Sequence, residues 1–130
     1  MKPDDMIASL RKVFLPALME RRFKGSLPHF RRIGDKQIDL LTVQFDRHGG
    51  GFVIEIAKCP PEGITTYWGK EIPPNKVAAW GLHPYDRRRL GSPHAGEDGH
   101  WFRFDDGTPT DSVAKSAALF LTEADRWWNP

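Results

Sequence analysis

Apolar residues recur at intervals of three and four positions over residues 4–22, as at Leu10, Phe14 and Leu18. This spacing places them on one face of a helix and predicts an amphipathic helix over the segment. Pro16 lies inside it, and a proline there removes a hydrogen bond and clashes with the preceding turn. We therefore expect a kink at Pro16 or two helices that meet there.

The pattern changes to period-two alternation after residue 28. It predicts three strands, His29–Ile33, Gln37–Phe45 and Phe52–Lys58, separated by turn residues. The second strand has apolar side chains on both of its faces, which is typical of a central strand or of one covered by helices. The connections are too short for a parallel crossover, so we expect an antiparallel meander.

Proline and glycine are frequent over residues 59–99, so we expect little regular structure there beyond a short helix at Asn75–Trp80 and a helical turn holding the arginines near Asp86. Alternation returns over His100–Phe104 and predicts a fourth strand. Residues 110–128 begin with Thr-Asp and have one apolar face, so they predict a C-terminal helix.

These elements predict an α+β fold over residues 1–130, taken as one domain. We expect a four-stranded antiparallel sheet, formed by the three-stranded meander and the later strand. The N- and C-terminal helices are expected to pack on one face of this sheet.

Composition adds few constraints. Hydrophobic residues make up 39% of the chain and charged residues 28%, which are ordinary values for a globular protein. No apolar stretch is long enough to span a membrane, and the first residues lack the order of a signal peptide, so we expect a cytoplasmic protein without membrane contact. The single cysteine, Cys59, excludes an internal disulfide. We expect no cofactor and no metal.

Positive charge is concentrated over residues 21–36, which contain six basic residues and one acidic residue. Adjacent strand positions point to opposite faces, so Arg31 and Arg32 should lie on different faces of the sheet. Guanidinium groups gathered in this way bind phosphate, carboxylate or an acidic protein surface. The alternative is that these are solvated side chains paired with Asp35, Asp39 and Glu20. The candidate residues for an anion or a partner are Arg21, Arg22, Lys24, Arg31 and Arg32.

Arg88 and Arg89 follow Arg87 in a second basic run and are candidates for the same kind of contact. The members of the run cannot all face one way on a helix, so solvated surface is the preferred interpretation. No motif of a known nucleic-acid module accompanies them, and nucleic-acid binding is not expected.

Catalytic motifs are absent from the sequence: it has no nucleophile elbow, phosphate-binding glycine loop or zinc-protease helix. We therefore assign no catalytic residue. A possible polar site comprises Gln44, His83 and His100. Histidines and carboxylates also occur together over His94–His100, but they match no metal-binding spacing, so a polar surface loop is preferred. Cys59 would need a partner histidine to act as a nucleophile.

Trp127 and Trp128 end the predicted C-terminal helix. They cannot both face the core from one helix, so we expect at least one to be partly exposed or buried against a partner. The alternative is a tryptophan that packs against the chain's own long loop.

Several motifs resemble a known family. They are Phe23-Lys24, Phe30-Arg31-Arg32, Gln44, Gly51-Phe52-Val53-Ile54 and, later, Arg88-Arg89-Leu90-Gly91. Together they resemble a family of bacterial proteins called domain of unknown function 4304. The resemblance implies an α+β fold and a bacterial cytoplasmic setting, and it implies no chemistry because the family's activity is unassigned. Arg22 stands where the family is expected to have a glycine, which puts the shape of the turn before Phe23 in question.

The preferred functional interpretation is a non-catalytic binding or protein-interaction module that uses the surface at residues 21–32 and the exposed face of the sheet. A toxin-neutralising immunity protein is one specific form. The alternative is a small enzyme or a protein that binds an anionic ligand, with a pocket between the sheet and residues 60–99. In that alternative Arg31 or Arg32 would hold the anion, and His83 or His100 would act on it.

Overall fold

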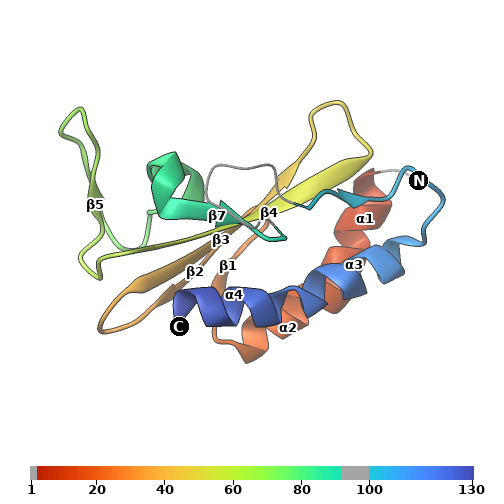
Figure 1. Cartoon of the computed structure of the whole chain (residues 1–130), viewed down its shortest axis with the longest axis horizontal. Helices are drawn as coiled ribbons and strands as arrows, with labels where there is room; N and C mark the ends of the chain where they lie inside the picture. Colours follow the sequence, from red (N-terminus) through yellow and green to blue (C-terminus); the bar gives the residue numbers. More distant parts are fainter. Residues whose placement is uncertain (1–2, 92–99) are drawn as a thin grey trace.

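A computed structural model describes residues 3–91 and 100–130 (Figure 1). The described residues form a six-stranded antiparallel sheet in the order β1-β2-β3-β4-β7, with β8 also paired to β4. The strands are β1 (Lys24–Ser26), β2 (His29–Ile33), β3 (Ile38–Phe45), β4 (Gly51–Cys59), β7 (Arg87–Arg89) and β8 (Phe102–Arg103). The predicted α+β class, the antiparallel meander β2-β3-β4 and the later fourth strand are confirmed.

Two strands of this sheet were not predicted. β1 extends the meander at one edge, and β7 pairs with β4 at the other. The prediction that the arginines near Asp86 lie in a helical turn is wrong: the 3-10 turn η3 (Pro84–Asp86) ends before them, and Arg87–Arg89 form β7. In β7 the side chains of Arg87 and Arg89 lie on one face of the sheet, and both reach Glu55 of β4.

The N-terminal helix was predicted to kink at Pro16 or to divide there into two helices; it instead passes through a π-helical segment just before the proline. It consists of α1 (Pro3–Ser9), a π-helical segment η1 (Leu10–Phe14) and α2 (Leu15–Glu20). The Leu15 N–H donates to the Leu10 carbonyl, five residues earlier, so the turn just before Pro16 is wider than an α-helical turn. This widening gives the proline ring room that a regular α-helix lacks.

The helix ends at a left-handed residue. Arg22 has φ of 66°, its N–H donates to Met19 O at 2.9 Å, and the Phe23 N–H donates to Leu18 O at 3.1 Å. These two bonds form a Schellman motif, in which glycine usually takes the left-handed position. The turn therefore forms with an arginine in the position that glycine usually takes, and the left-handed backbone of this arginine costs about 1 kcal/mol of folding free energy.

The C-terminal helix is broken once. α3 (Thr110–Leu119) and α4 (Leu121–Trp128) meet at Phe120, whose N–H is shared between Ser116 O at 3.3 Å and Ala117 O at 3.2 Å. The sequence predicted one helix over this range. A shared bond of this kind marks a locally tightened turn. The structure therefore corrects the single helix to two short ones in sequence.

The helices cover one face of the sheet (Figure 1), as predicted. Buried residues of α1, η1, α2, α3 and α4 form one core with alternate residues of β2, β3 and β4. The sheet residues of this core include Phe30, Leu41, Val43, Ile54 and Ile56. Each such side chain contributes about 1.5–3 kcal/mol when it is fully removed from water.

The second face of the sheet is covered in part by residues 60–86. Val77 and Ala79 are buried against Ile38 and Leu40 of β3 and against β4. Cover on both faces confirms the interpretation of the strand that is apolar on both sides.

Residues 60–86 contain a hairpin of β5 (Ile64–Thr65) and β6 (Glu71–Ile72), where no strand was predicted. In place of the helix expected over Asn75–Trp80 there is only the 3-10 turn η2 (Ala79–Gly81). No helix among the described residues has the length and apolar character needed to cross a membrane.

Candidate functional site

Hollows open beside the segment that crosses the second face of the sheet, and two of them gather aromatic or basic side chains. The larger measures about 600 Å³ and lies between the end of β4, the β5–β6 hairpin and residues 80–86. We call it the aromatic hollow. Its apolar lining includes Ile64, Tyr67, Trp68, Trp80 and Leu82.

The aromatic side chains at this hollow are unusually exposed. Tyr67 is 97% exposed, Trp68 64% and Trp80 58%, and Tyr85 beside them is 78% exposed. Tyr67 and Trp68 pack edge to face on each other at 4.7 Å, near the tip of the hairpin that projects from the sheet (Figure 1). The hairpin tip therefore presents aromatic surface to solvent.

Trp80 packs on one end of a row of polar side chains that runs across four strands. The register places His29 of β2, Thr42 of β3, Glu55 of β4 and Arg89 of β7 side by side. The His29 ring packs against Trp80 at 4.4 Å, and its Nδ1 lies 2.9 Å from Thr42 Oγ1. Burial lowers the pKa of His29, and so does the nearby positive charge of Arg31. The row is thus anchored at one end by an aromatic contact and at the other by an ion pair.

The buried carboxylate in this row was not identified from the sequence. Glu55 is 6% exposed and lies 2.8 Å from Arg87 Nη1 and 3.8 Å from Arg89 Nε. A buried carboxylate needs such partners to remain charged. The second basic run thus lies at a structural ion pair, and the signal in the sequence was the single acidic residue within the apolar strand Phe52–Lys58.

Cys59 lines the aromatic hollow but is not an activated thiol. Burial raises its pKa to about 11, and the charges of Asp39 and Glu62 act in the same direction. At neutral pH the sulfur is therefore almost entirely protonated, and the thiol is a poor nucleophile.

Two further side chains that line the hollow, His83 and Lys58, make structural contacts. His83 Nδ1 accepts a hydrogen bond from the Tyr85 N–H at 3.2 Å and so caps η3. Lys58 Nζ donates to Trp127 O at 2.9 Å and lies over the Trp127 ring. A hollow is thus present where the alternative function expected a pocket, and His83 lines it, but Arg31, Arg32 and His100 lie elsewhere.

The smaller hollow, of about 320 Å³, lies at the start of the sheet. We call it the basic hollow. Its lining residues are Arg22, Lys24, Gly25, Arg31, Ile33 and Asn75. Lys24 and Arg31 are cross-strand neighbours on β1 and β2. Arg31 is held in place because its Nε and Nη2 donate to Val77 O at 3.2 and 3.1 Å.

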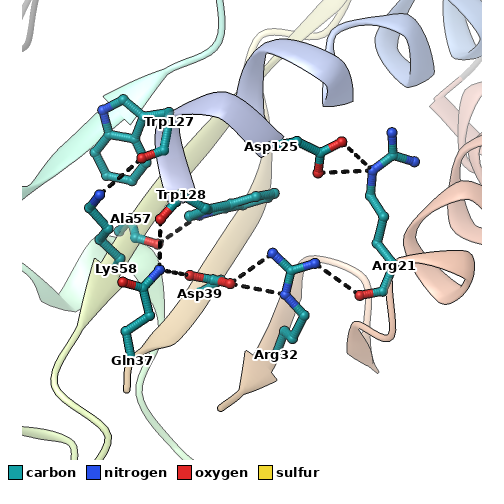
Figure 2. A network of polar contacts seen from close by, with 9 residues as sticks. All are labelled: Arg21, Arg32, Gln37, Asp39, Ala57, Lys58, Asp125, Trp127 and Trp128. Carbon is teal, nitrogen blue, oxygen red and sulfur yellow. Dashed lines mark hydrogen bonds and ion pairs between the residues drawn. The ribbon is translucent and has the colours of Figure 1, made fainter. Parts of the chain in front are cut away.

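The other two candidate arginines from residues 21–36, Arg21 and Arg32, lie on the helix side of the sheet (Figure 2). Arg21 Nε donates to both carboxylate oxygens of Asp125, at 3.1 and 3.0 Å. Arg32 donates to Asp39 Oδ2 at 2.9 and 2.7 Å and to Arg21 O at 3.0 Å. The expected alternation of Arg31 and Arg32 thus divides the cluster between two faces.

The last candidate residues are scattered. Gln44 is exposed and lies opposite Val53 near one end of β3. Arg88 lies opposite Ile56 in β7. The His100 ring packs against Phe120 at 5.2 Å. The structure therefore does not bring Gln44, His83 and His100 into one site.

The possible metal loop lies largely outside the described residues, because these end at 91 and resume at His100. Within the described ranges, no three histidine, cysteine or carboxylate side chains are grouped closely enough to hold a metal ion.

Trp127 and Trp128 differ as expected. Trp127 is partly exposed, whereas Trp128 is 1% exposed and its indole N–H donates to Ala57 O at 3.0 Å (Figure 2). The buried tryptophan packs on the chain's own sheet and on Phe23, at 4.9 Å between rings, and not on the long loop.

The geometry defines an α+β protein whose antiparallel sheet has helices on one face and open hollows, among them the aromatic hollow and the basic hollow, beside the other. Residues 14–129 match the model of a family described as Domain of unknown function (DUF4304), and the chain belongs to this family. The resemblance drawn from motifs in the first half of the chain and from Arg88-Arg89-Leu90-Gly91 is confirmed, and the match extends over nearly the whole chain. Searches of the curated proteins and of the solved structures found no match.

Proposed function

We propose that this protein is a non-catalytic binding module that recognises a segment of a partner protein at the aromatic hollow. The observation that carries the proposal is the exposure of Tyr67, Trp68 and Trp80 around one hollow, at 97%, 64% and 58%. Tryptophan and tyrosine are the residues most enriched among those that dominate the energy of protein interfaces. Exposed apolar patches of this kind mark interaction sites.

A protein segment suits the site better than a small molecule. Tyr67 and Trp68 pack on each other near the tip of a projecting hairpin, so a ligand confined to the floor of the hollow would leave them in water (Figure 1). A polypeptide chain is long enough to contact the floor and the hairpin tip together. Two rigid aromatic side chains also lose little conformational entropy on binding.

The chemistry of the lining supports binding over catalysis. A catalytic centre needs a titratable group within hydrogen-bond reach of the group that it activates. Here the Cys59 thiol has its pKa raised to about 11, and His83 Nδ1 accepts a backbone hydrogen bond. An immunity-type protein, which neutralises a toxin by binding it, is one specific form of the proposed module.

Selection from a random peptide library tests the proposal. Peptides that bind the wild-type protein are measured by isothermal titration calorimetry against Trp68→Ala and Trp80→Ala. We expect each variant to weaken binding at least about tenfold, because truncation of such anchors typically costs about 2 kcal/mol or more. Leu119→Ala is the matched control, since Leu119 is 76% exposed but lies at the end of α3.

Circular dichroism must show that both tryptophan variants stay folded, because Trp80 also contacts His29. Enriched peptides whose affinity is unchanged in both variants would contradict the proposal. So would a library that yields no binder while small aromatic fragments bind the hollow, since that result favours a small-molecule site.

A further inference from the structure

Three positive side chains line the basic hollow, and no acidic residue among the described ranges lines it with them. Arg22 comes from the turn after α2, Lys24 from β1 and Arg31 from β2. The cations of the same cluster on the helix side, Arg21 and Arg32, pair with Asp125 and Asp39 instead. The face opposite the helices therefore keeps the uncompensated share of this positive charge.

The three cations differ in how firmly they are held. Arg31 donates from Nε and Nη2 to Val77 O, which fixes the guanidinium plane and leaves Nη1 with both of its N–H groups for another acceptor. Within residues 3–91 and 100–130, the side chains of Arg22 and Lys24 have no hydrogen-bond or ion-pair partner. The hollow thus combines one preorganised donor with two adaptable ones.

The backbone at Arg22 provides an independent observation. With φ of 66°, Arg22 takes the left-handed position of a Schellman motif, where glycine is the unstrained choice. A strained non-glycine residue at such a position motivates a functional hypothesis for its side chain. In the basic hollow that side chain supplies the third positive charge.

We propose that the basic hollow binds a phosphate group. A phosphate dianion offers three oxygen acceptors, and Arg22, Lys24 and Arg31 surround the hollow with charged donors. Ile33, which is 54% exposed, lies on the rim and provides an apolar surface for an organic substituent of the phosphate. The ligand chemistry is therefore a phosphate monoester or inorganic phosphate. This proposal is independent of the aromatic hollow.

The test is a titration of ¹⁵N-labelled protein with inorganic phosphate and, separately, with phenyl phosphate at low ionic strength. We expect saturable shifts of amide signals around residues 22–33 and 75. Tighter binding of phenyl phosphate assigns the site to phosphate esters, and equal affinities assign it to inorganic phosphate. Both results support the proposal.

Variants make the test specific. We expect Arg31→Gln to weaken binding at least about tenfold, as loss of a charge-assisted donor requires. Arg22→Gly should weaken it about fivefold and should also raise the urea midpoint of unfolding, because glycine relieves the left-handed backbone. Arg11→Gln, an exposed change on the N-terminal helix, is the control.

Three results would overturn the proposal: no saturable binding of either probe, equal weakening by the Arg11 control, or an Arg22→Gly protein that is stabilised but binds as the wild type does. A raised urea midpoint of Arg22→Gly would show that this variant is folded, and its lost binding then could not be attributed to misfolding. None of these results bears on the peptide test of the aromatic hollow.

Discussion

Replacement of Trp128 should be among the most damaging single changes at the C-terminus. The indole is 1% exposed, donates to Ala57 O at 3.0 Å and packs at 4.9 Å on the Phe23 ring. The side chain thus joins the end of α4 to the sheet through the bond to Ala57, which Figure 2 shows, and to the turn after α2 through Phe23.

The magnitude follows from burial. A tryptophan side chain buries about 150–200 Å² of mostly apolar surface, which at about 25 cal/mol per Å² corresponds to about 4–5 kcal/mol. Trp128→Ala should therefore reduce the free energy of unfolding by about 4 kcal/mol, within the usual range for such truncations. Trp128→Phe keeps most of the apolar contact but loses the hydrogen bond to Ala57 and some volume, so we expect a loss of about 2 kcal/mol.

Urea unfolding followed by far-ultraviolet circular dichroism measures these differences. With a slope of about 2 kcal/mol per M, the midpoint should fall by about 2 M for Trp128→Ala and about 1 M for Trp128→Phe. Trp127→Ala is the control: the ring packs against the core but is only partly buried, and its contact with the Lys58 ammonium at 4.8 Å is worth about 0.5–1 kcal/mol, so we expect a smaller loss than for Trp128→Ala. Equal losses in the two alanine variants would refute the reasoning.

Three further predictions concern buried polar groups. The pKa of Cys59, raised to about 11, leaves roughly one thiol in a thousand ionised at pH 8, so a disulfide reagent should modify the native protein far more slowly than the urea-unfolded chain; equal rates would contradict this. Burial and the charge of Arg31 lower the pKa of His29 below 6.5, so the unfolded state takes up the proton first and stability should fall as pH decreases through 6.5. His29→Gln should remove this part of the slope between pH 7.5 and 5.5, and an unchanged slope would count against it. Arg32→Gln leaves the 7%-exposed Asp39 carboxylate without its ion-pair partner, so the free energy of unfolding should drop by about 3 kcal/mol, and a loss below about 1 kcal/mol would show that the pair is not structural.

The predicted parts of the fold are those whose pattern is local. Alternation in β2, β3 and β4 is readable because their apolar residues meet a core on at least one face. β7 was missed because nothing in the run Arg87–Arg89 indicates a strand. Its pairing depends on Glu55, which lies on β4 more than thirty positions earlier in the chain and receives two of its arginines. Tertiary context of this kind overrides local propensity.

The candidate site residues likewise divide into those that a local pattern predicted and those that depend on distant parts of the chain. Alternation predicted correctly that Arg31 and Arg32 would separate, and the pairing of Arg32 with Asp39 was among the alternatives. The partner of Arg21, Asp125, comes from the other end of the chain and has no local signal. No local signal in the sequence indicated that Trp68 would be exposed, because a tryptophan in a proline- and glycine-rich segment is compatible with core and surface alike.

One short stretch of basic sequence therefore has two physical roles. On the helix side, Arg21 and Arg32 are held by carboxylates, and a cation paired in this way adds packing and orientation but little outward potential. On the opposite side, Arg22, Lys24 and Arg31 line one hollow without an acidic neighbour in its described lining, so their charges add. Counting charge along the chain cannot separate these roles, because the pleat sends successive residues to different faces. What distinguishes a binding surface from a structural one here is the distribution of acids between the two faces, which only the tertiary fold determines.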